Sequence, residues 1–195
     1  MTLIEIGEKA RLASRILATV SSSDKNKALT YIADDLEKYS DKILAANTID
    51  LENAEKSGMK ASMVDRLRLT EDRIKAIAEG VRQVRDLPDP VGEVIGAMRR
   101  PNGLQIAKRR VPLGVIGIIY ESRPNVTADT AVLCLKSSNA CILRGGKEAI
   151  NSNSAIADIM KDAVKRAGLP DGTVELIRDT SRETASEILI SSSAL

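Results

Sequence analysis

The stretches RVPLGVIGIIYESRPNVT (110–127) and CILRGGKE (141–148) decide the fold. The run Val115–Tyr120 is apolar, mostly β-branched and followed by a polar turn, so we predict a strand that is buried on both faces. Residues Thr127–Lys136 carry apolar side chains at helical spacing, and a second short apolar run, Ala140–Leu143, ends at two glycines. A strand, a crossover helix and a second strand indicate a parallel sheet, and ligands usually bind at the carboxyl edge of such a sheet.

Residues 1–90 are predicted to form a helical block that serves as scaffold. Apolar residues recur every three or four positions over Thr2–Val20, and further helices are expected at Lys25–Tyr39 and Ser40–Gly58. Thr70 is expected to cap a fourth helix, which ends before the proline-rich residues 88–90.

Residues 91–111 change to extended segments, and we expect a projecting β-hairpin there. Its turn contains Pro101-Asn102-Gly103, and Asn-Gly tolerates positive φ at both turn positions. No acidic residue lies between Val94 and Tyr120, and two interpretations of this basic ribbon stay open. It is a solvated face, or it pairs with a partner subunit, because an isolated two-stranded ribbon is marginally stable. The cations are Arg99, Arg100, Lys108, Arg109 and Arg110.

The rest of the chain continues the same α/β pattern. A helix is predicted at Ile150–Ala167, a strand at Val174–Ile177 and a last helix at Ser181–Ser191. Three strands are fewer than a doubly wound sheet usually has, so residues 112–195 are expected to be the first half of a Rossmann-like domain. A sheet cut midway exposes a strand edge and apolar faces, and we therefore expect the chain to self-associate.

Composition excludes several classes of function. The 29 basic and 27 acidic residues nearly balance, and there is no Phe or Trp on which bases could stack, so no nucleic-acid partner is expected. No apolar run is long enough for a membrane span, and the charged amino terminus is unlike a signal peptide, which predicts a cytoplasmic protein. The chain has no histidine, so any chemistry runs without imidazole, and no metal site is expected. Cys134 and Cys141 are expected to be buried core residues.

The turn after the first strand, Glu121-Ser122-Arg123-Pro124-Asn125, is a candidate substrate site. It offers a carboxylate, a hydroxyl, a guanidinium and an amide within five residues. Because Pro124 restricts Arg123 to extended conformations, these groups are candidates for a fixed geometry around an anionic substrate. The alternative is a capped turn in which Asn125 or Thr127 satisfies the start of the helix.

The loop after the second strand, Arg144-Gly145-Gly146-Lys147, is a candidate cofactor site. Glycines let a ligand approach the backbone, and two cations suit phosphate or ribose oxygens. A Gly-Gly turn with two surface cations would look the same. By contrast, Gly114-Val115-Ile116-Gly117 precedes its strand and lacks the dinucleotide fingerprint, so we discount it.

The runs PLGVIG (112–117), YESRPNVT (120–127) and LRGGKE (143–148) closely resemble the gamma-glutamyl phosphate reductases. These enzymes, also called glutamate-5-semialdehyde dehydrogenases, form a family within the aldehyde dehydrogenase superfamily. The similarity covers nearly the whole chain. Further similar stretches are DRL (65–67), LPDPVG (87–92) and DTSRE (179–183).

The resemblance implies NADPH-dependent reduction of L-glutamyl 5-phosphate to L-glutamate 5-semialdehyde, a step of proline biosynthesis. It implies that Arg144 contacts the adenosine ribose and that Lys147 suits a 2′-phosphate. It also implies that Ser122, or the nearby amide of Asn125, holds the oxyanion. A homo-oligomer formed through residues 91–111 and a functional association with glutamate 5-kinase are further implied partners.

The chain departs from that family in length. Members are roughly twice as long, and their second half carries the catalytic cysteine and another Gly-rich cofactor loop. Cys134 and Cys141 lie in apolar segments and do not match the nucleophile, because a reactive thiolate needs an electropositive, partly exposed setting. We therefore expect the 195 residues alone to be catalytically inactive. The rival hypothesis is a non-catalytic oligomerisation or regulatory module of the same fold.

Overall fold

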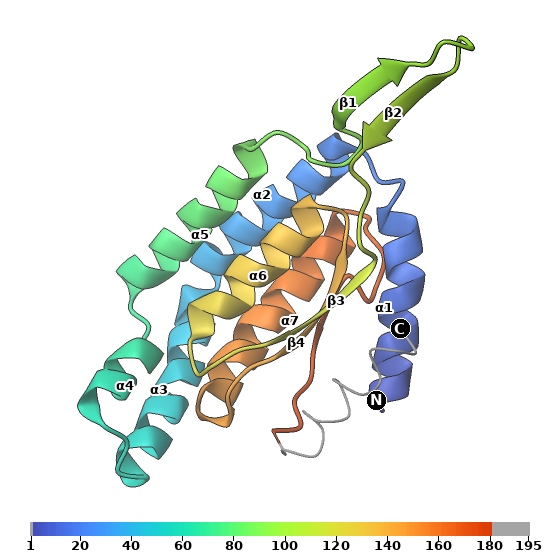
Figure 1. Ribbon diagram of the computed structural model, residues 1–195. Helices are drawn as coiled ribbons and strands as arrows, with labels where there is room; N and C mark the ends of the chain where they lie inside the picture. Colours follow the sequence, from blue (N-terminus) through green and yellow to red (C-terminus); the bar gives the residue numbers. More distant parts are fainter. Residues whose placement is uncertain (1, 181–195) are drawn as a thin grey trace.

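The computed structural model describes residues 2–180, in which a helical block is followed by a hairpin and a parallel sheet (Figure 1). The predicted helix at 181–191 lies outside the described residues. The helices are α1 (Leu3–Leu17), α2 (Ser22–Lys38), α3 (Ser40–Lys56), α4 (Ala61–Leu67), α5 (Glu71–Asp86), α6 (Pro124–Lys136), the 3₁₀ turn η1 (Lys147–Ala149) and α7 (Ile150–Arg166). The strands are β1 (Val94–Arg99), β2 (Gln105–Arg109), β3 (Val115–Ile119), β4 (Ala140–Arg144) and β5 (Val174–Leu176).

Side-chain caps explain where the first helices begin. Thr2 forms a capping box with Glu5, and the hydroxyl of Ser21 accepts a hydrogen bond from the N–H of Asp24 at 3.1 Å. Helix α2 therefore begins at Ser22, three residues before the predicted start. Thr70 caps α5 as predicted. Helix α4 was not predicted, because seven residues are too few to show a clear helical period.

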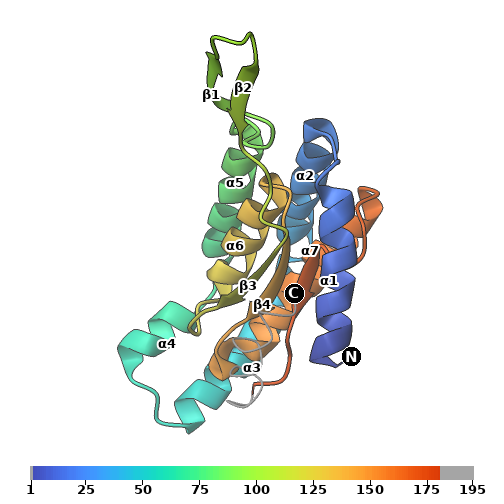
Figure 2. The same ribbon diagram turned by 45° about the vertical axis from the view of Figure 1, so that its right-hand side comes forward.

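The parallel sheet has the strand order β3-β4-β5. Helices α6 and α7 cross over on one face, and α1 packs against the other (Figures 1 and 2). Helices α2, α3 and α5 form a further layer on α6 and α7. A single apolar core runs through the sheet and most of the helical block. The predicted α/β fold class is confirmed.

The prediction that the first strand is buried on both faces is wrong. Strand β3 has one neighbour in the described sheet, and Gly117 and Ile119 are exposed. Helices α1 and α6 pack mainly against β4 and much less against β3, whereas the other end strand, β5, is covered by α7. Strand β5 is buried at every residue, and the central strand β4 is buried except at Arg144, which is partly exposed.

The hairpin of β1 and β2 projects from one end of the molecule, and every residue of both strands is exposed (Figures 1 and 2). Its turn differs from the prediction, since only Gly103 takes positive φ, at 86°. The N–H of Gly103 donates to the carbonyl of Arg100 at 2.9 Å. The N–H of Arg100 in turn donates to the carbonyl of Leu104 at 2.8 Å. The side-chain oxygen of Asn102 accepts from the N–H of Leu104 instead. A three-residue loop with one left-handed glycine satisfies the same geometry.

A buried lysine fixes the foot of the hairpin. Lys25 is 1% exposed, and its ammonium lies 2.7 Å from a carboxylate oxygen of Asp89 and donates to the Ser138 hydroxyl at 2.9 Å. Burial alone would raise the pKa of Asp89, but hydrogen bonds from Lys25 and Ser22 lower it. The chain entering the hairpin is thereby tied to the start of α2 and the end of α6.

Helix α7 has no cap from its own amino-terminal residues. The buried carboxylate of Asp50, on α3, accepts hydrogen bonds from the Ser152 N–H at 2.8 Å and the Ser152 hydroxyl at 2.6 Å. Its other oxygen accepts from the N–H of Asn151 at 3.2 Å. An acidic group at a helix amino terminus is favourable in both hydrogen bonding and charge.

Candidate functional site

Two turns meet at the carboxyl edge of the sheet. Because β3 and β4 are parallel, with Ile119 opposite Arg144, they end at the same edge. The N–H of Tyr120 donates to the carbonyl of Arg144 at 3.1 Å and extends the pairing by one residue. The turn 121–125 and the loop 145–148 are therefore neighbours, at the edge where parallel sheets usually bind ligands.

Gly145 and Gly146 are required by the packing of these turns. A Cβ on Gly145 would lie 2.2 Å from the buried amide nitrogen of Asn153 and 3.0 Å from the Tyr120 ring. A Cβ on Gly146 would lie 2.2 Å from the Ser122 hydroxyl. A larger side chain at Gly145 would displace the Asn153 amide or the Tyr120 ring, and one at Gly146 would displace Ser122 in the facing turn.

Ser122 and Glu148 join the two turns directly. The Ser122 hydroxyl donates to a carboxylate oxygen of Glu148 at 2.5 Å. Burial alone would raise the pKa of Glu148, but this hydrogen bond and the charges of Lys147 and Arg144 lower it. Glu148 is therefore ionised at neutral pH, and the hydroxyl hydrogen of Ser122 is already donated to it.

Two cations flank the loop after β4. Lys147 is exposed, whereas Arg144 is half-buried and donates from Nη2 to the backbone carbonyl of Thr180 at 2.9 Å. An ammonium and a guanidinium at the carboxyl edge form a donor set that fits the phosphate and ribose oxygens of a nucleotide. The residues present thus fit a phosphorylated nucleotide.

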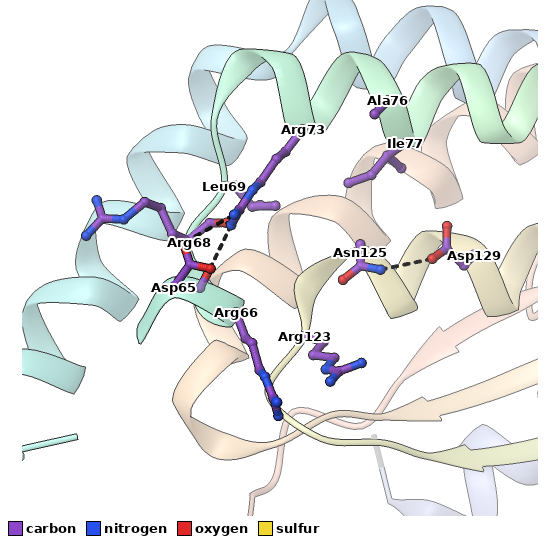
Figure 3. Close-up of a pocket in the computed structure, with 10 residues that line it drawn as sticks. All are labelled: Asp65, Arg66, Arg68, Leu69, Arg73, Ala76, Ile77, Arg123, Asn125 and Asp129. Carbon is purple, nitrogen blue, oxygen red and sulfur yellow. Dashed lines mark hydrogen bonds and ion pairs between the residues drawn. The ribbon is translucent and has the colours of Figure 1, made fainter. Parts of the chain in front are cut away.

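A pocket of about 450 Å³ lies between the start of α6 and the segment that joins α4 to α5 (Figure 3). Its walls come from parts of the chain that are far apart in sequence. The lining residues are Asp65, Arg66, Arg68, Leu69, Arg73, Ala76, Ile77, Arg123, Asn125 and Asp129.

The pocket carries an excess of positive charge. Arg73 is part of the wall, since its Nη1 donates to the carbonyls of Asp65 and Arg68, both at 2.6 Å. Within residues 2–180, the side chains of Arg66, Arg68 and Arg123 form no ion pair. Figure 3 shows the Arg68 side chain pointing away from the pocket, whereas Arg66 and Arg123 point toward the same space. Two guanidinium groups that the described chain does not neutralise favour an anionic ligand there.

One carboxylate of the pocket lies on α6. The amide nitrogen of Asn125 donates to Asp129 at 3.1 Å, and Figure 3 shows the pair one helical turn apart. Burial raises the pKa of Asp129, and the Asn125 hydrogen bond offsets part of that increase. The pocket therefore combines guanidinium donors with one carboxylate that is protonated more readily than usual.

The alternative of a capped turn before α6 is wrong. Arg123 occupies the cap position without a side-chain hydrogen bond, and Pro124 begins the helix. Thr127 instead contacts the Tyr120 hydroxyl at 2.7 Å and donates to Asn153 at 3.0 Å. Proline at the first helical position removes one N–H that would otherwise need a partner.

The structure separates the predicted substrate residues into two places. Arg123 and Asn125 line the arginine pocket, whereas Ser122 faces the loop after β4. The contributions of Arg66 and Arg68 to the pocket wall were not predicted. The DRL run at 65–67 resembles the reductase family, but nothing local places it beside a turn nearly sixty residues later.

Both cysteines are buried, as predicted, with Cys134 6% exposed and Cys141 0% exposed. The Cys134 thiol and burial raise the pKa of the Cys141 thiol well above its usual range, the opposite of an activated nucleophile. Residues 2–180 contain no cluster of acidic, cysteine or histidine side chains able to hold a metal ion. In the same range, no helix is long and apolar enough to cross a bilayer.

The parallel sheet, its covering helices and the match of a family model to residues 3–194 show that the chain belongs to the aldehyde dehydrogenase family. Within that family it is 55% identical to the gamma-glutamyl phosphate reductase of Syntrophomonas wolfei, over 94% of this chain and 44% of that protein. The resemblance noted in the sequence is thereby confirmed.

Two solved structures of the same name share the fold. The gamma-glutamyl phosphate reductase of Thermotoga maritima superposes with a TM-score of 0.93 at 46% identity, over 96% of this chain and 45% of that one. The Saccharomyces cerevisiae protein gives a TM-score of 0.85 at 37% identity, over 91% of this chain and 46% of that one. The chain thus spans less than half the length of these relatives.

Proposed function

We propose that this chain belongs to an oxidoreductase that reduces L-glutamyl 5-phosphate to L-glutamate 5-semialdehyde with NADPH, in proline biosynthesis. The observation that carries the proposal is the pocket in which the side chains of Arg66 and Arg123 approach each other without ion-pair partners among residues 2–180 (Figure 3). The 55% identity to a gamma-glutamyl phosphate reductase supports the same reaction. A cytoplasmic location suits the two reduced, buried cysteines.

The proposed substrate matches the charges of the pocket. L-Glutamyl 5-phosphate carries an acyl phosphate, a carboxylate and an ammonium group. The guanidinium groups of Arg66 and Arg123 suit the two anionic groups, because planar forks bind such oxygens in pairs. Asp129 suits the ammonium, and binding a cation would lower the pKa that burial raises.

The proposed cofactor contributes a hydride when it is bound. The chain's own part is to bind and orient it, with Lys147 on the 2′-phosphate, Arg144 near the ribose, and Gly145 and Gly146 holding the loop. No thiol in residues 2–180 is placed for attack, so we expect the 195 residues alone not to reduce the substrate. We further propose a functional association with glutamate 5-kinase, which makes the acyl phosphate.

The alternative function is a non-catalytic oligomerisation or regulatory module. It is favoured by the hairpin, whose strands are fully exposed and place Met98 opposite Ile106 in the ladder. An apolar pair on a projecting ribbon suits a contact with a second copy of the chain. We propose that residues 91–111 make this contact whether or not the chain takes part in catalysis.

Binding measurements on the purified chain test the proposal. We expect calorimetric titration to show tighter binding of NADPH than of NADH, and we expect Lys147→Glu to abolish the difference. A stable phosphonate analogue of the substrate should bind, and Arg123→Ala should weaken its binding roughly tenfold or more. Arg100→Ala, on the hairpin tip, is the matched control. Binding of neither nucleotide nor analogue would support the non-catalytic alternative.

A further inference from the structure

We propose that Ser122 is a positioning residue that sets the preference for NADPH by holding the carboxylate of Glu148 away from the 2′-phosphate site at Lys147. This inference rests on the proposed cofactor. It assigns Ser122 a task different from the oxyanion contact that the family resemblance implies.

The geometry begins with an acidic residue in an unfavourable place. Glu148 follows Lys147 directly in the η1 turn, and its charge interacts with that ammonium. A carboxylate free to rotate beside Lys147 would offset the attraction of the cation for a phosphate group. NADP sites therefore gain from removing or restraining such a group.

The structure restrains it from two sides. The Ser122 hydroxyl donates to Glu148 Oε2 at 2.5 Å, a short, charge-assisted hydrogen bond. The same oxygen lies 3.1 Å from where a Cβ on Gly146 would be, so the side chain is folded back over that glycine. Lys147 remains exposed at the carboxyl edge. The turn after β3 thus fixes the Glu148 carboxylate over Gly146, so that it is not free to rotate toward the outer side of Lys147.

The restraint also explains why both partners are polar. The hydroxyl of Ser122 has one hydrogen, and the structure directs it at Glu148. In that arrangement it offers no hydrogen to an oxyanion. The Ser122 hydroxyl also packs closely against Gly146. A Cβ at position 146 would lie 2.2 Å from that hydroxyl, so the contact requires glycine there.

A double-mutant cycle on the whole chain tests the inference, with the ratio of dissociation constants for NADPH and NADH as the readout. Ser122→Ala frees the carboxylate, and we expect it to reduce the preference for NADPH about fivefold. Glu148→Gln removes the charge and should keep or increase the preference. Ser122→Ala combined with Glu148→Gln should restore it, because no charge is left to restrain.

The outcomes separate this inference from the function on which it rests. A wild-type chain that binds NADPH and NADH equally would overturn the proposed cofactor, and the inference with it. If the wild type prefers NADPH but Ser122→Ala keeps the whole preference, the cofactor stands and the role of Ser122 is wrong. If the single and double variants all bind NADPH and NADH more weakly by the same factor, Ser122 has only a general structural role. That result also overturns the inference.

Discussion

Strands β2 and β4 each contain five residues, yet they lie in opposite environments. All of β2 is exposed, whereas β4 is buried except at Arg144. Strand β2 has a single partner, β1, reached through a three-residue loop, whereas β4 has a partner on each side and helices on both faces. The stability of the molecule thus resides around β4, and the hairpin is held only at its foot. A ribbon that contributes little to the core is free to make contacts outside it.

The largest expected effect comes from truncating a side chain in each strand pair. Leu143→Ala removes a side chain that is 0% exposed, and we expect a loss of about 3 kcal/mol in the free energy of unfolding. Met98→Ala, in the hairpin, removes a side chain that is 57% exposed. It should change the free energy of unfolding by less than about 0.5 kcal/mol. Urea denaturation of both variants measures the two values. Equal losses would contradict the contrast between the strands.

The second effect concerns two ion pairs at the foot of the hairpin. Lys25→Met leaves Asp89 without its buried partner and should cost about 2 kcal/mol or more. Arg110→Met breaks the ion pair between Arg110 and Glu93, in which the two side chains are 53% and 54% exposed. This substitution should lower the free energy of unfolding by less than about 0.5 kcal/mol. Thermal denaturation followed by circular dichroism compares the two. A larger effect at the exposed pair would show that the hairpin is anchored elsewhere.

Two glycines extend the contrast to the backbone. Gly145→Ala would bring a Cβ to 2.2 Å from the buried Asn153 amide, and we expect a loss of about 1–3 kcal/mol. Gly96→Ala, in β1, meets nothing within 4 Å and should be neutral or slightly stabilising. Denaturant midpoints measure both changes. If Gly145→Ala is tolerated, the turns at the carboxyl edge are less tightly packed than the distances indicate.

The smallest expected effect depends on pH at the point where hairpin and body meet. The pKa of Asp89 is lower in the folded state than its ordinary value of 3.8, so the folded chain holds fewer protons there. Its contribution is therefore present above about pH 4 and is lost as the pH falls through the folded-state pKa. We expect Asp89→Asn to remove this part of the decrease in the free energy of unfolding at acid pH, which amounts to less than about 1 kcal/mol. Unfolding curves recorded between about pH 5 and pH 2 measure it. An unchanged pH dependence would show that other carboxylates account for it.

Much of the fold could be predicted because its signals are local. The continuous apolar run of β4, the helical period of α6 and the cap at Thr70 each act within a few residues. The prediction that β3 is buried on both faces was wrong because a run of apolar residues does not reveal which helices cover the strand. Helix α4 was missed because seven residues show too little periodicity.

The candidate site was predictable only in part. The polar turn with Arg123 and Asn125 follows its strand directly, and the sequence indicated it. Arg66 meets that turn only through the packing of α5 against α6. The pairing of Ser122 with Glu148 likewise depends on the register of two parallel strands, which no short stretch of sequence encodes.

The cap of α7 by Asp50 has a consequence for the order of folding. The two hydrogen-bonded residues Asp50 and Ser152 are 102 positions apart, so the cap forms only after a long loop has closed. On a ribosome, α3 leaves the exit tunnel well before α7 is made. The Asp50 carboxylate is therefore already outside the tunnel when α7 emerges. We expect α7 to become stable as it docks on α3 rather than in isolation.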